Sequence, residues 1–224
     1  CQVVRREPAD GPGVHAIPRR LGEIVLRVPG RHNLQNALAA VAVGLELDVP
    51  FSRIAAALDA FRGAERRFQS HGDAGGVLVI EDYGHHPTEV AAVIGAARSA
   101  LNRRLLVVFQ PHRYSRTRGL LDRFGPALSG ADEVVLTDIY AAGEDPIPGV
   151  TVDLLAEHVR RAVAAPLHVV RAIADLPREV SRIARPGDVV ILLGAGSIGG
   201  AAGPIVEALT AAAGGREGGG GGRG

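Results

Sequence analysis

The stretch Val77-Leu-Val-Ile-Glu-Asp-Tyr-Gly-His-His-Pro-Thr-Glu89 decides how the rest of this chain is interpreted. Its first half is a continuous run of β-branched and leucine residues, which is typical of a parallel strand buried on both faces. Its second half reaches Pro87, a residue suited to the first turn of a helix. The polar residues 82–86 therefore follow a buried strand, where open α/β sheets place their chemistry.

The alternation of strand and helix continues from this stretch to residue 213. Apolar runs predict strands at 77–82, 104–110, 133–139, 167–171 and 188–193. Amphipathic segments predict helices at 87–101, 117–129, 152–165, 175–184 and 198–213. Strands that alternate with helices of this length form βαβ units, so we expect an α/β fold: a mostly parallel, Rossmann-like sheet with helices on both faces.

The first 63 residues have a different pattern. Residues 1–28 alternate polar and apolar on both sides of a Pro- and Gly-rich segment, 8–13, which predicts antiparallel strands joined by a turn. Helices are predicted at 32–47 and 51–61. We expect this part to be a separate unit that ends at Gly63.

The remaining boundaries follow from composition. Residues 64–213 carry the strand and helix alternation and form the second expected domain. The tail 214–224 is almost all glycine, has no apolar content to bury and is expected to be disordered.

The composition excludes several classes of protein. A chain of 224 residues with 46% hydrophobic residues holds one large or two modest cores and has no apolar run of membrane-spanning length. Its 25 basic and 24 acidic residues give no argument for a nucleic acid or a membrane surface as partner. The one cysteine, Cys1, excludes a disulfide framework and fits a reducing compartment, so a cytoplasmic location is expected.

The absence of lysine and the absence of methionine each bear on the interpretation. All the basic residues are arginine, so a P-loop lysine, a Schiff base and a lysine general base are excluded within this chain. There is also no methionine, so we expect a processed chain or a fragment of a longer one.

Polar loops follow four of the predicted strands. The carboxyl ends of parallel strands meet at one edge of a sheet, so we expect these loops to form a single site. They are residues 82–86, 110–118, 140–145 and 194–199.

The second of these loops is the clearest candidate for binding an anion. Arg113 and Arg116 present planar guanidinium groups suited to a carboxylate or phosphate, beside a predicted helix N-terminus. A solvated basic loop is the alternative, but His112 and Tyr114 at a strand end favour the receptor.

The adjacent His85 and His86 do not predict a metal site, because neighbouring histidines point apart and lack the i, i+4 spacing of helical ligands. We expect one of them to contact a substrate and the other to cap or pack. At the predicted helix start near residue 32, Asn33 and Asn36 share one face, where they bind a ligand or cap the helix. Their spacing alone favours capping.

The segment Gly194-Ala-Gly-Ser-Ile-Gly199 matches the dinucleotide fingerprint and follows a strand. The acidic residue expected about 20 residues further on, which would bind a ribose, is replaced by the glycine tail. Close packing of a helix therefore explains these glycines better, and an NAD-type Rossmann module remains the alternative function.

Five motifs resemble the Mur ligase family in the right order and over nearly the whole chain apart from the tail. Tyr-Gly-His-His-Pro-Thr-Glu and His-Arg-Tyr-Ser-Arg are most similar to the family member that adds L-alanine. The motifs are Gly30-Arg-His-Asn-Leu-Gln-Asn-Ala37, Glu65-Arg-Arg-Phe-Gln69, Glu81-Asp-Tyr-Gly-His-His-Pro-Thr-Glu89, Phe109-Gln-Pro-His-Arg-Tyr-Ser-Arg-Thr117 and Tyr140-Ala-Ala-Gly-Glu144. Their number also argues against a stand-alone interaction domain.

The resemblance implies that 1–63 is the C-terminal part of a central ATPase domain and that 64–213 is the C-terminal ligase domain. It implies an ATP- and Mg²⁺-dependent ligase of peptidoglycan synthesis that joins L-alanine to UDP-N-acetylmuramate through an acyl phosphate. The P-loop lysine and the magnesium ligands would belong to an earlier segment that this chain lacks. The chain alone is therefore expected to be inactive, and its oligomeric state is left open.

The resemblance also implies roles for individual residues. Those expected to bind ATP are His32, Asn33, Asn36, Arg67 and Asp82, with Arg67 at the phosphates and Asp82 at the ribose. Those expected to bind alanine and the acyl end of the sugar nucleotide are Tyr83, His85, Arg113 and Arg116. Those expected to take part in catalysis are Arg67, His85 and Arg113.

Overall fold

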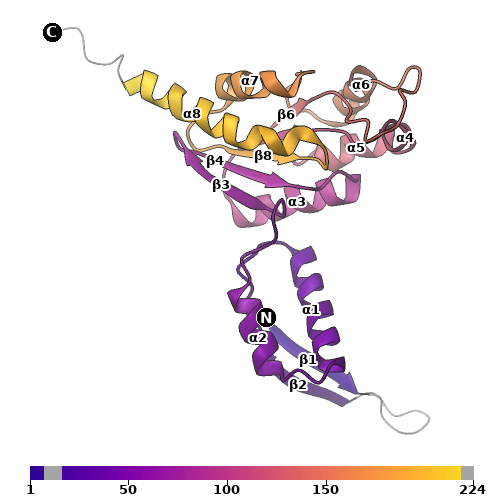
Figure 1. The fold of residues 1–224 in the computed structure, drawn as a ribbon, viewed down its shortest axis with the longest axis vertical. Coiled ribbons are helices and arrows are strands. Elements are labelled where there is room, and N and C mark those ends of the chain that lie inside the picture. The colour runs from indigo at the N-terminus through magenta and orange to yellow at the C-terminus, as the bar shows by residue number, and fades with distance from the viewer. Residues whose placement is uncertain (8–16, 218–224) are drawn as a thin grey trace, which may run out of the picture. The chain divides into compact units, whose positions relative to one another are not determined.

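The computed structural model describes residues 1–7 and 17–217 of the chain. The chain folds into two compact units, Cys1–Gly63 and Ala64–Gly224 (Figure 1). Each unit has its own apolar core. The two units are therefore separate folded parts, each with its own sheet.

The first unit is a two-stranded sheet followed by two helices. Strands β1 (Gln2–Glu7) and β2 (Ile17–Glu23) pair antiparallel, and helices α1 (Arg31–Glu46) and α2 (Phe51–Ala60) follow. The predicted antiparallel pair and both helices are confirmed. The turn predicted at 8–13 lies outside the described residues.

The second strand of this pair is shorter than predicted. The N–H of Ile24 donates to the carbonyl of Cys1 at 2.9 Å, and residues 25–28 continue without strand pairing because β1 has reached its first residue there. The buried core of the unit consists of Val3, Ile24, Ala37, Val41 and Ile54.

The second unit is built on a six-stranded sheet, with strand order β3-β4-β8-β5-β6-β7. All neighbouring pairs are parallel except β3 and β4, so the predicted mostly parallel sheet is confirmed. The strands are β3 (Gln69–Ala74), β4 (Val77–Asp82), β5 (Leu105–Phe109), β6 (Glu133–Leu136), β7 (Leu167–Val169) and β8 (Val189–Leu193).

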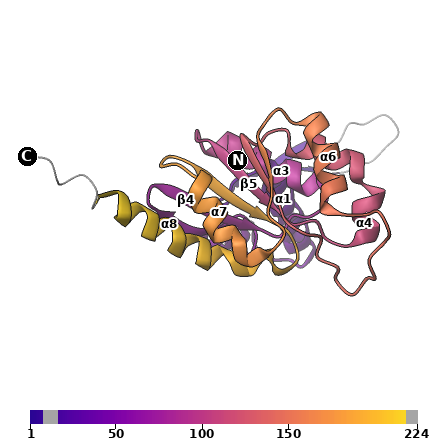
Figure 2. The same ribbon diagram turned by 90° about the horizontal axis from the view of Figure 1, so that it is seen from above.

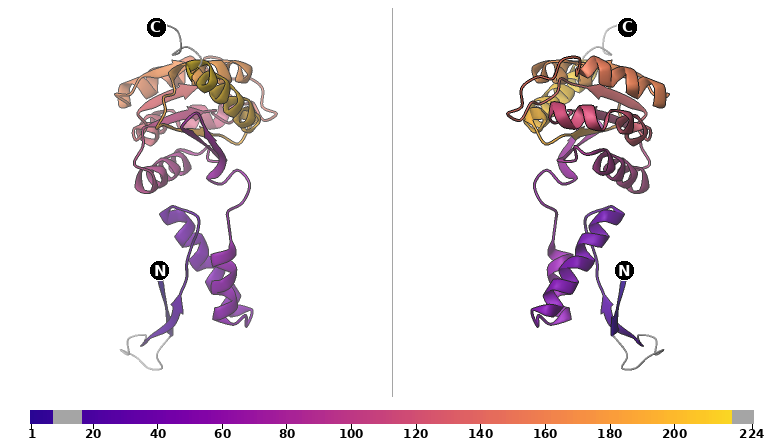
Figure 3. Two further views of the ribbon diagram at one scale, coloured as in Figure 1. Left: turned by 90° about the vertical axis from the view of Figure 1, so that its left-hand side faces the viewer. Right: turned by 90° about the vertical axis from the view of Figure 1, so that its right-hand side faces the viewer.

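Helices cover both faces of the sheet, as predicted. Helices α3, α5 and α6 share one core with the sheet, and α7 and α8 share the other (Figure 2). Figure 3 shows the same layering from the two sides of the second unit. The α-helices are α3 (Pro87–Ala100), α4 (Tyr114–Gly119), α5 (Leu121–Leu128), α6 (Val152–Ala162), α7 (Leu176–Ile183) and α8 (Ala202–Glu217). Two 3-10 helices are η1 (Ile173–Asp175) and η2 (Ser197–Ala201).

The path of the chain through the sheet explains this layering. From β4 the chain passes over one position to β5 and then moves outward through β6 to β7. It then returns through α7 to β8, which lies between β4 and β5. Right-handed crossovers in opposite directions place their helices on opposite faces. Strand β8 is therefore a topological switch point, where loops leave toward both faces and ligand crevices form.

Strand β3 was not predicted. Its sequence, Gln-Ser-His-Gly-Asp-Ala, is polar, and only Ala74 of this strand is buried. It pairs along the antiparallel edge of β4 through its backbone. An edge strand held by backbone hydrogen bonds needs no alternating apolar pattern, so the sequence contained no periodic signal for it.

Two predicted helices are divided in the structure. The segment 117–129 is α4 and α5, which are separated at Leu120 directly after Gly119. The segment 198–213 is η2 followed by α8, and α8 continues to Glu217, into the tail that was expected to be disordered. Residues 218–224 lie outside the described part of the chain.

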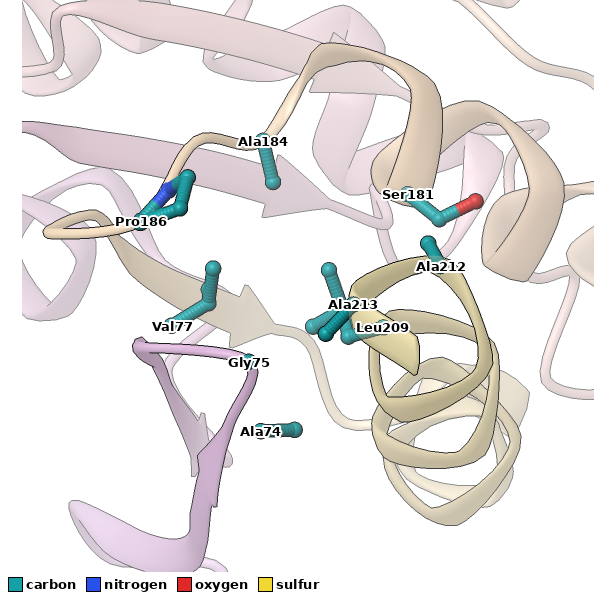
Figure 4. A pocket seen from close by; sticks show the side chains of 9 residues that line it. All are labelled: Ala74, Gly75, Val77, Ser181, Ala184, Pro186, Leu209, Ala212 and Ala213. Atoms are coloured by element: carbon teal, nitrogen blue, oxygen red, sulfur yellow. The ribbon is translucent and has the colours of Figure 1, made fainter. Parts of the chain in front are cut away.

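An apolar cavity of about 240 Å³ lies at the amino ends of β4 and β8, on the edge of the sheet opposite the polar loops (Figure 4). Its one hydroxyl, that of Ser181, donates to the carbonyl of Arg178 at 3.0 Å. None of its lining residues is charged: Ala74, Gly75, Val77, Ser181, Ala184, Pro186, Leu209, Ala212 and Ala213. The cavity therefore offers no group for catalysis.

Candidate functional site

The polar loops that follow β4, β8 and β5 meet at the carboxyl edge of the sheet. The N–H of Gly194, after β8, donates to the carbonyl of Asp82 at 3.2 Å. The amide side chain of Gln110, after β5, accepts from the N–H of Ile198 at 3.0 Å. It also donates to the hydroxyl of Ser197 at 3.1 Å. The predicted convergence of these loops is confirmed.

The loop after β6 is joined to the same group. The N–H of Arg113 donates to the carbonyl of Tyr140 at 2.8 Å, and the N–H of Tyr140 donates to the carbonyl of Pro111 at 2.9 Å. Glu144 accepts from the N–H of Ser115 at 3.0 Å and from its hydroxyl at 2.6 Å. These bonds fix the start of α4, where Arg113 has a φ of 71°. Positive φ in a non-glycine residue is costly and persists where the surroundings impose it, often at functional sites.

Asp82 organises the turn between β4 and α3. One carboxylate oxygen accepts from the N–H of Gly84 at 2.7 Å and the other from the N–H of Phe68 at 2.8 Å. The residue is only 4% exposed. Its carboxylate therefore orders the loop that carries Tyr83. The contact of Asp82 with a ribose remains a prediction.

The glycines of the fingerprint-like segment pack against side chains of the protein itself. A Cβ on Gly196 would lie 2.4 Å from Cγ of Tyr140 and 2.6 Å from Oε1 of Gln110. A Cβ on Gly199 would lie 2.6 Å from Oε1 of Glu81. In a dinucleotide site this space admits the pyrophosphate, but here it is filled. Close packing, the interpretation that the sequence favoured, explains both glycines.

Sequence reasoning missed the ion pair of Arg66 and Glu81. The Nε–H of Arg66 donates to Oε1 of Glu81 at 2.6 Å, and His71 Nε2 lies 2.9 Å from the second oxygen. Glu81 is 4% exposed and follows four apolar residues of β4. Such a buried carboxylate requires a partner, so its position in the strand was the signal that a cation lies nearby.

The ring of Tyr83 lies between the strand-end loops and the two adjacent arginines. The guanidinium carbon of Arg66 lies 4.9 Å from the ring centroid, and that of Arg67 lies 5.6 Å from it. Within residues 1–7 and 17–217, the side chain of Arg67 makes no hydrogen bond or ion pair, and only its backbone N–H donates, to the carbonyl of Ala64 at 3.1 Å. The site therefore contains one guanidinium that is already bonded to the protein and one that is not.

The two adjacent histidines have different surroundings. His86 is the N-cap of α3, where its Nδ1 accepts from the N–H of Thr88 at 3.3 Å, so the prediction that one histidine caps is confirmed. Glu89 accepts from the N–H of His85 at 3.0 Å and from that of His86 at 3.1 Å. Burial raises the pKa of Glu89, but these two bonds and the charges of His85 and Arg67 outweigh it and hold the pKa below its ordinary value.

This carboxylate gives a pH-dependent prediction. A carboxyl group with a lowered pKa in the folded state stabilises the fold above its ordinary value of 4.5 and loses that contribution as the pH falls through the folded pKa. Glu89→Gln keeps capping capacity but removes the charge. We expect the variant to be less stable than the native chain by about 0.5–1 kcal/mol at pH 7. The difference should vanish near pH 3 in urea unfolding. A difference that is constant with pH would contradict the assignment.

Four rings form a row along the carboxyl edge of the sheet. The ring centroids of Tyr83 and His85 are 5.6 Å apart, those of His85 and His112 are 5.1 Å apart, and those of His112 and Tyr140 are 5.5 Å apart. Tyr140 was not among the predicted site residues, although its position after a strand marked it. The row gives the site flat ring faces, with the polar atoms of the rings at their edges.

Hydrogen bonds fix the protons of the two histidines in this row. A carbonyl only accepts, so His85 donates its Nδ1–H to the carbonyl of Tyr83 at 3.1 Å, which leaves the lone pair of the neutral ring on Nε2. A guanidinium only donates, so His112 Nδ1 accepts from Arg116 at 3.0 Å and its Nε2 carries the hydrogen. The site thus presents one imidazole acceptor and one imidazole donor.

The pKa of His112 favours this neutral donor form. Burial holds the pKa below its ordinary value of 6.5, and the charges of His85, Arg116 and Arg113 lower it further. Glu144 opposes the effect.

The two predicted arginines of this loop are used differently. Arg116 donates to Nδ1 of His112 at 3.0 Å and to its carbonyl at 3.4 Å. Among the described residues, the guanidinium of Arg113 has no hydrogen-bond or ion-pair partner. Arg113 is therefore the second uncommitted guanidinium at this edge, besides Arg67.

The predicted ATP-binding residues of the first unit lie at the start of α1. Asn33 donates its Nδ2–H to the carbonyl of Pro29 at 2.7 Å. The N-cap residue is Gly30, and no side chain caps the helix, so the capping alternative for Asn33 and Asn36 is wrong. His32 is half-buried and Asn36 is exposed.

Two further features are absent from the residues that the structure describes. No three histidine, cysteine or acidic side chains in this part of the chain are grouped so that they could hold a metal ion. None of the helices described has both the length and the apolar character that crossing a bilayer requires.

The fold and the loops define the class of this protein: a Rossmann-like α/β domain with its polar loops at a topological switch point. Residues 66–196 match the family described as "Mur ligase, glutamate ligase domain". The chain belongs to the Mur ligase family.

Curated relatives and solved structures agree with this family. The chain is 50% identical over 191 residues to a UDP-N-acetylmuramate–L-alanine ligase of Trichlorobacter lovleyi, covering 85% of the chain and 42% of that protein. It is 48% identical to the enzyme of the same name from Salinibacter ruber, covering 85% of the chain and 40% of that protein. A crystal structure of UDP-N-acetylmuramate-alanine ligase from Thermotoga maritima matches 87% of the chain and 40% of its own length, with a TM-score of 0.68 and 28% identity. The chain thus spans less than half the length of these relatives.

Proposed function

We propose that this chain is the C-terminal part of a cytoplasmic ligase that joins L-alanine to UDP-N-acetylmuramate in peptidoglycan synthesis. The observation that carries the proposal is the pair of uncommitted guanidiniums, Arg67 and Arg113, beside the ring row at the carboxyl edge of the sheet. Both proposed ligands and the acyl phosphate between them are anionic, and planar arginine groups recognise carboxylates and phosphates. The printed names of the curated relatives support the choice of substrates.

In the proposed reaction, the amine of L-alanine attacks an acyl phosphate formed from the sugar carboxylate and ATP, and phosphate leaves. Catalysis of this kind depends mostly on positioning and on electrostatic stabilisation. Arg113 would hold the carboxylate of alanine, with Arg116 beside it, and Tyr83 would border the bound substrates. The lone pair on Nε2 of His85 would accept a hydrogen bond from the attacking amine.

Several residues are proposed to contact ATP. Arg67 would contact its phosphates, because its guanidinium has no other ionic partner among the described residues. Asp82 would contact the ribose from the turn that its two backbone hydrogen bonds fix. His32, Asn33 and Asn36 would contact the adenine.

No three histidine, cysteine or acidic side chains of the described residues are grouped as metal ligands, and the sequence has no lysine for a P-loop. We therefore assign the magnesium ligands and the P-loop to residues outside the chain. The chain by itself would bind parts of the substrates but would not complete the ligation.

The proposal is tested by titrating the ¹⁵N-labelled chain with L-alanine, ADP-Mg²⁺ and NAD in separate experiments. We expect L-alanine to shift the amides of His85 and Arg113, and ADP-Mg²⁺ to shift those near Arg67 and Asp82. Arg113→Gln should abolish the response to alanine and keep the response to ADP. NAD is the discriminating ligand, because shifts confined to the loop at Gly196 with NAD would replace the ligase proposal by a dinucleotide-binding module.

A further inference from the structure

The adjacent side chains of Arg66 and Arg67 differ in their contacts: the guanidinium of Arg66 is bonded to the protein and that of Arg67 is not. The backbone conformation determines this difference. Arg66 has a φ of 55° and Phe68 a φ of 50°, conformations that non-glycine residues seldom adopt. Two hydrogen bonds fix this turn. The N–H of Tyr83 donates to the carbonyl of Arg66 at 2.6 Å, and the N–H of Arg66 donates to Oε1 of Gln69 at 2.7 Å. The turn directs the side chain of Arg66 into the protein.

The side chain of Arg66 joins the ends of two neighbouring strands. Its Nε–H donates to Glu81 of β4 at 2.6 Å. Its Nη2 donates to the carbonyl of Gly194 at 2.8 Å and to that of Gly196 at 3.3 Å, both after β8. Its guanidinium carbon lies 4.9 Å from the ring centroid of Tyr83. One planar group thus contacts β4, the glycine loop and the ring of a candidate substrate-binding residue.

The last glycine of the fingerprint-like segment leaves room for this arrangement. A Cβ on Gly199 would lie 2.6 Å from Oε1 of Glu81 and 3.0 Å from Nη2 of Arg66. Glu81 is almost fully buried, and Gly199 of η2 lies against both partners of the ion pair. The glycine segment therefore fits around the Arg66 side chain in the way that a dinucleotide fingerprint fits around a pyrophosphate.

We propose that Arg66 is a positioning residue, which fixes Tyr83 and the Gly194–Gly199 loop relative to each other and so leaves Arg67 for an anionic ligand. The binding of an anionic ligand by Arg67 rests on the proposed function, whereas the positioning by Arg66 does not.

Lysine could not replace Arg66 in this role. The position requires directional N–H donors to a carboxylate and to two carbonyls, and a flat face against the ring of Tyr83. An ammonium group is a point charge without a planar face. Arg66→Lys therefore keeps the charge next to Glu81 and removes the geometry, which separates positioning from simple charge balance.

Amide hydrogen exchange in the labelled chain tests the positioning. The N–H of Tyr83 and the N–H of Gly194 are both bonded across this junction, to Arg66 and Asp82 respectively. We expect Arg66→Lys to speed exchange at both amides by about tenfold or more relative to the native chain. Arg67→Lys is the matched control, and it should leave both rates within about twofold, since the side chain of Arg67 makes no hydrogen bond with the described residues. The exchange rate of the Val107 amide in β5 should be the same in both variants as in the native chain.

The same samples are titrated with ADP-Mg²⁺. We expect Arg66→Lys and Arg67→Lys each to weaken the response of the native chain at least about fivefold, the first through displaced loops and the second through the lost contact. Exchange rates in Arg66→Lys equal to those of the native chain would overturn the proposal, as would an equal acceleration in both variants. If the native chain does not respond to ADP-Mg²⁺, the proposed function fails for this chain, while the exchange rates still decide the role of Arg66.

Discussion

Arg104→Ala is expected to lower the free energy of unfolding of the second unit by about 3–5 kcal/mol. Arg104 precedes β5 and donates to Asp188 at 2.6 Å and to Glu133. Both carboxylates are buried. Without the guanidinium, Glu133 would keep His168 at 2.7 Å and Asp188 would keep the N–H of Arg185 at 2.8 Å. Two buried negative charges would then lie close together without their shared cation.

The matched control is Arg171→Ala. Arg171 also bridges two carboxylates, those of Asp138 and Asp153, but all three side chains are more than half exposed. Its loss should therefore change stability far less than the loss of Arg104. Urea unfolding at pH 7 measures both. If the two variants unfold at the same urea concentration, burial does not decide the strength of these pairs and the prediction is wrong.

Gly196→Ala is expected to destabilise the second unit by about 1–3 kcal/mol and to distort the carboxyl edge of the sheet. The added Cβ would lie 2.4 Å from Cγ and 2.8 Å from Cβ of Tyr140, so the ring must move away from its stacked position on His112. It would also lie 2.6 Å from Oε1 of Gln110, which accepts from the N–H of Ile198. Ring shifts of Tyr140 and His112 in NMR spectra would report the change directly.

Gly95→Ala is expected to have the opposite effect on stability to Gly196→Ala. Gly95 lies inside α3, and a Cβ there would meet nothing within 4 Å. Alanine should stabilise this helix by about 0.5–1 kcal/mol. If both glycine variants change the thermal midpoint in the same direction, the close approach at Gly196 does not govern its effect.

The strands of the parallel sheet could be predicted from the sequence because their signal is local. The run at β4 was predicted with its observed bounds, and β5 and β8 were predicted to within one residue at each end. Burial on both faces demands apolar residues at every position, so each strand is marked by its own sequence. The helix predicted over 117–129 is divided after Gly119 into α4 and α5.

The site could be predicted only in part. Its polar loops are marked by the local sequence, whereas the contacts between them join residues that are far apart in the chain. Polar residues after strands identified Asp82, Tyr83, His85 and Arg113. The contact of Arg66 with Gly194 joins residues 128 positions apart, and no local pattern encodes it. A backbone turn likewise determines which of the two adjacent arginines faces inward. Only Arg67 was assigned a role from the sequence.

The central place of β8 in the sheet has a consequence for biosynthesis. Because β8 lies between β4 and β5, a nascent chain that has not yet reached residue 189 contains no strand to join these two. Until then, both strands expose unpaired backbone edges with apolar side chains, the kind of surface that aggregates or recruits chaperones. The second unit can therefore close its sheet only once β8 has left the ribosome, although β4 and β5 are synthesised well before it.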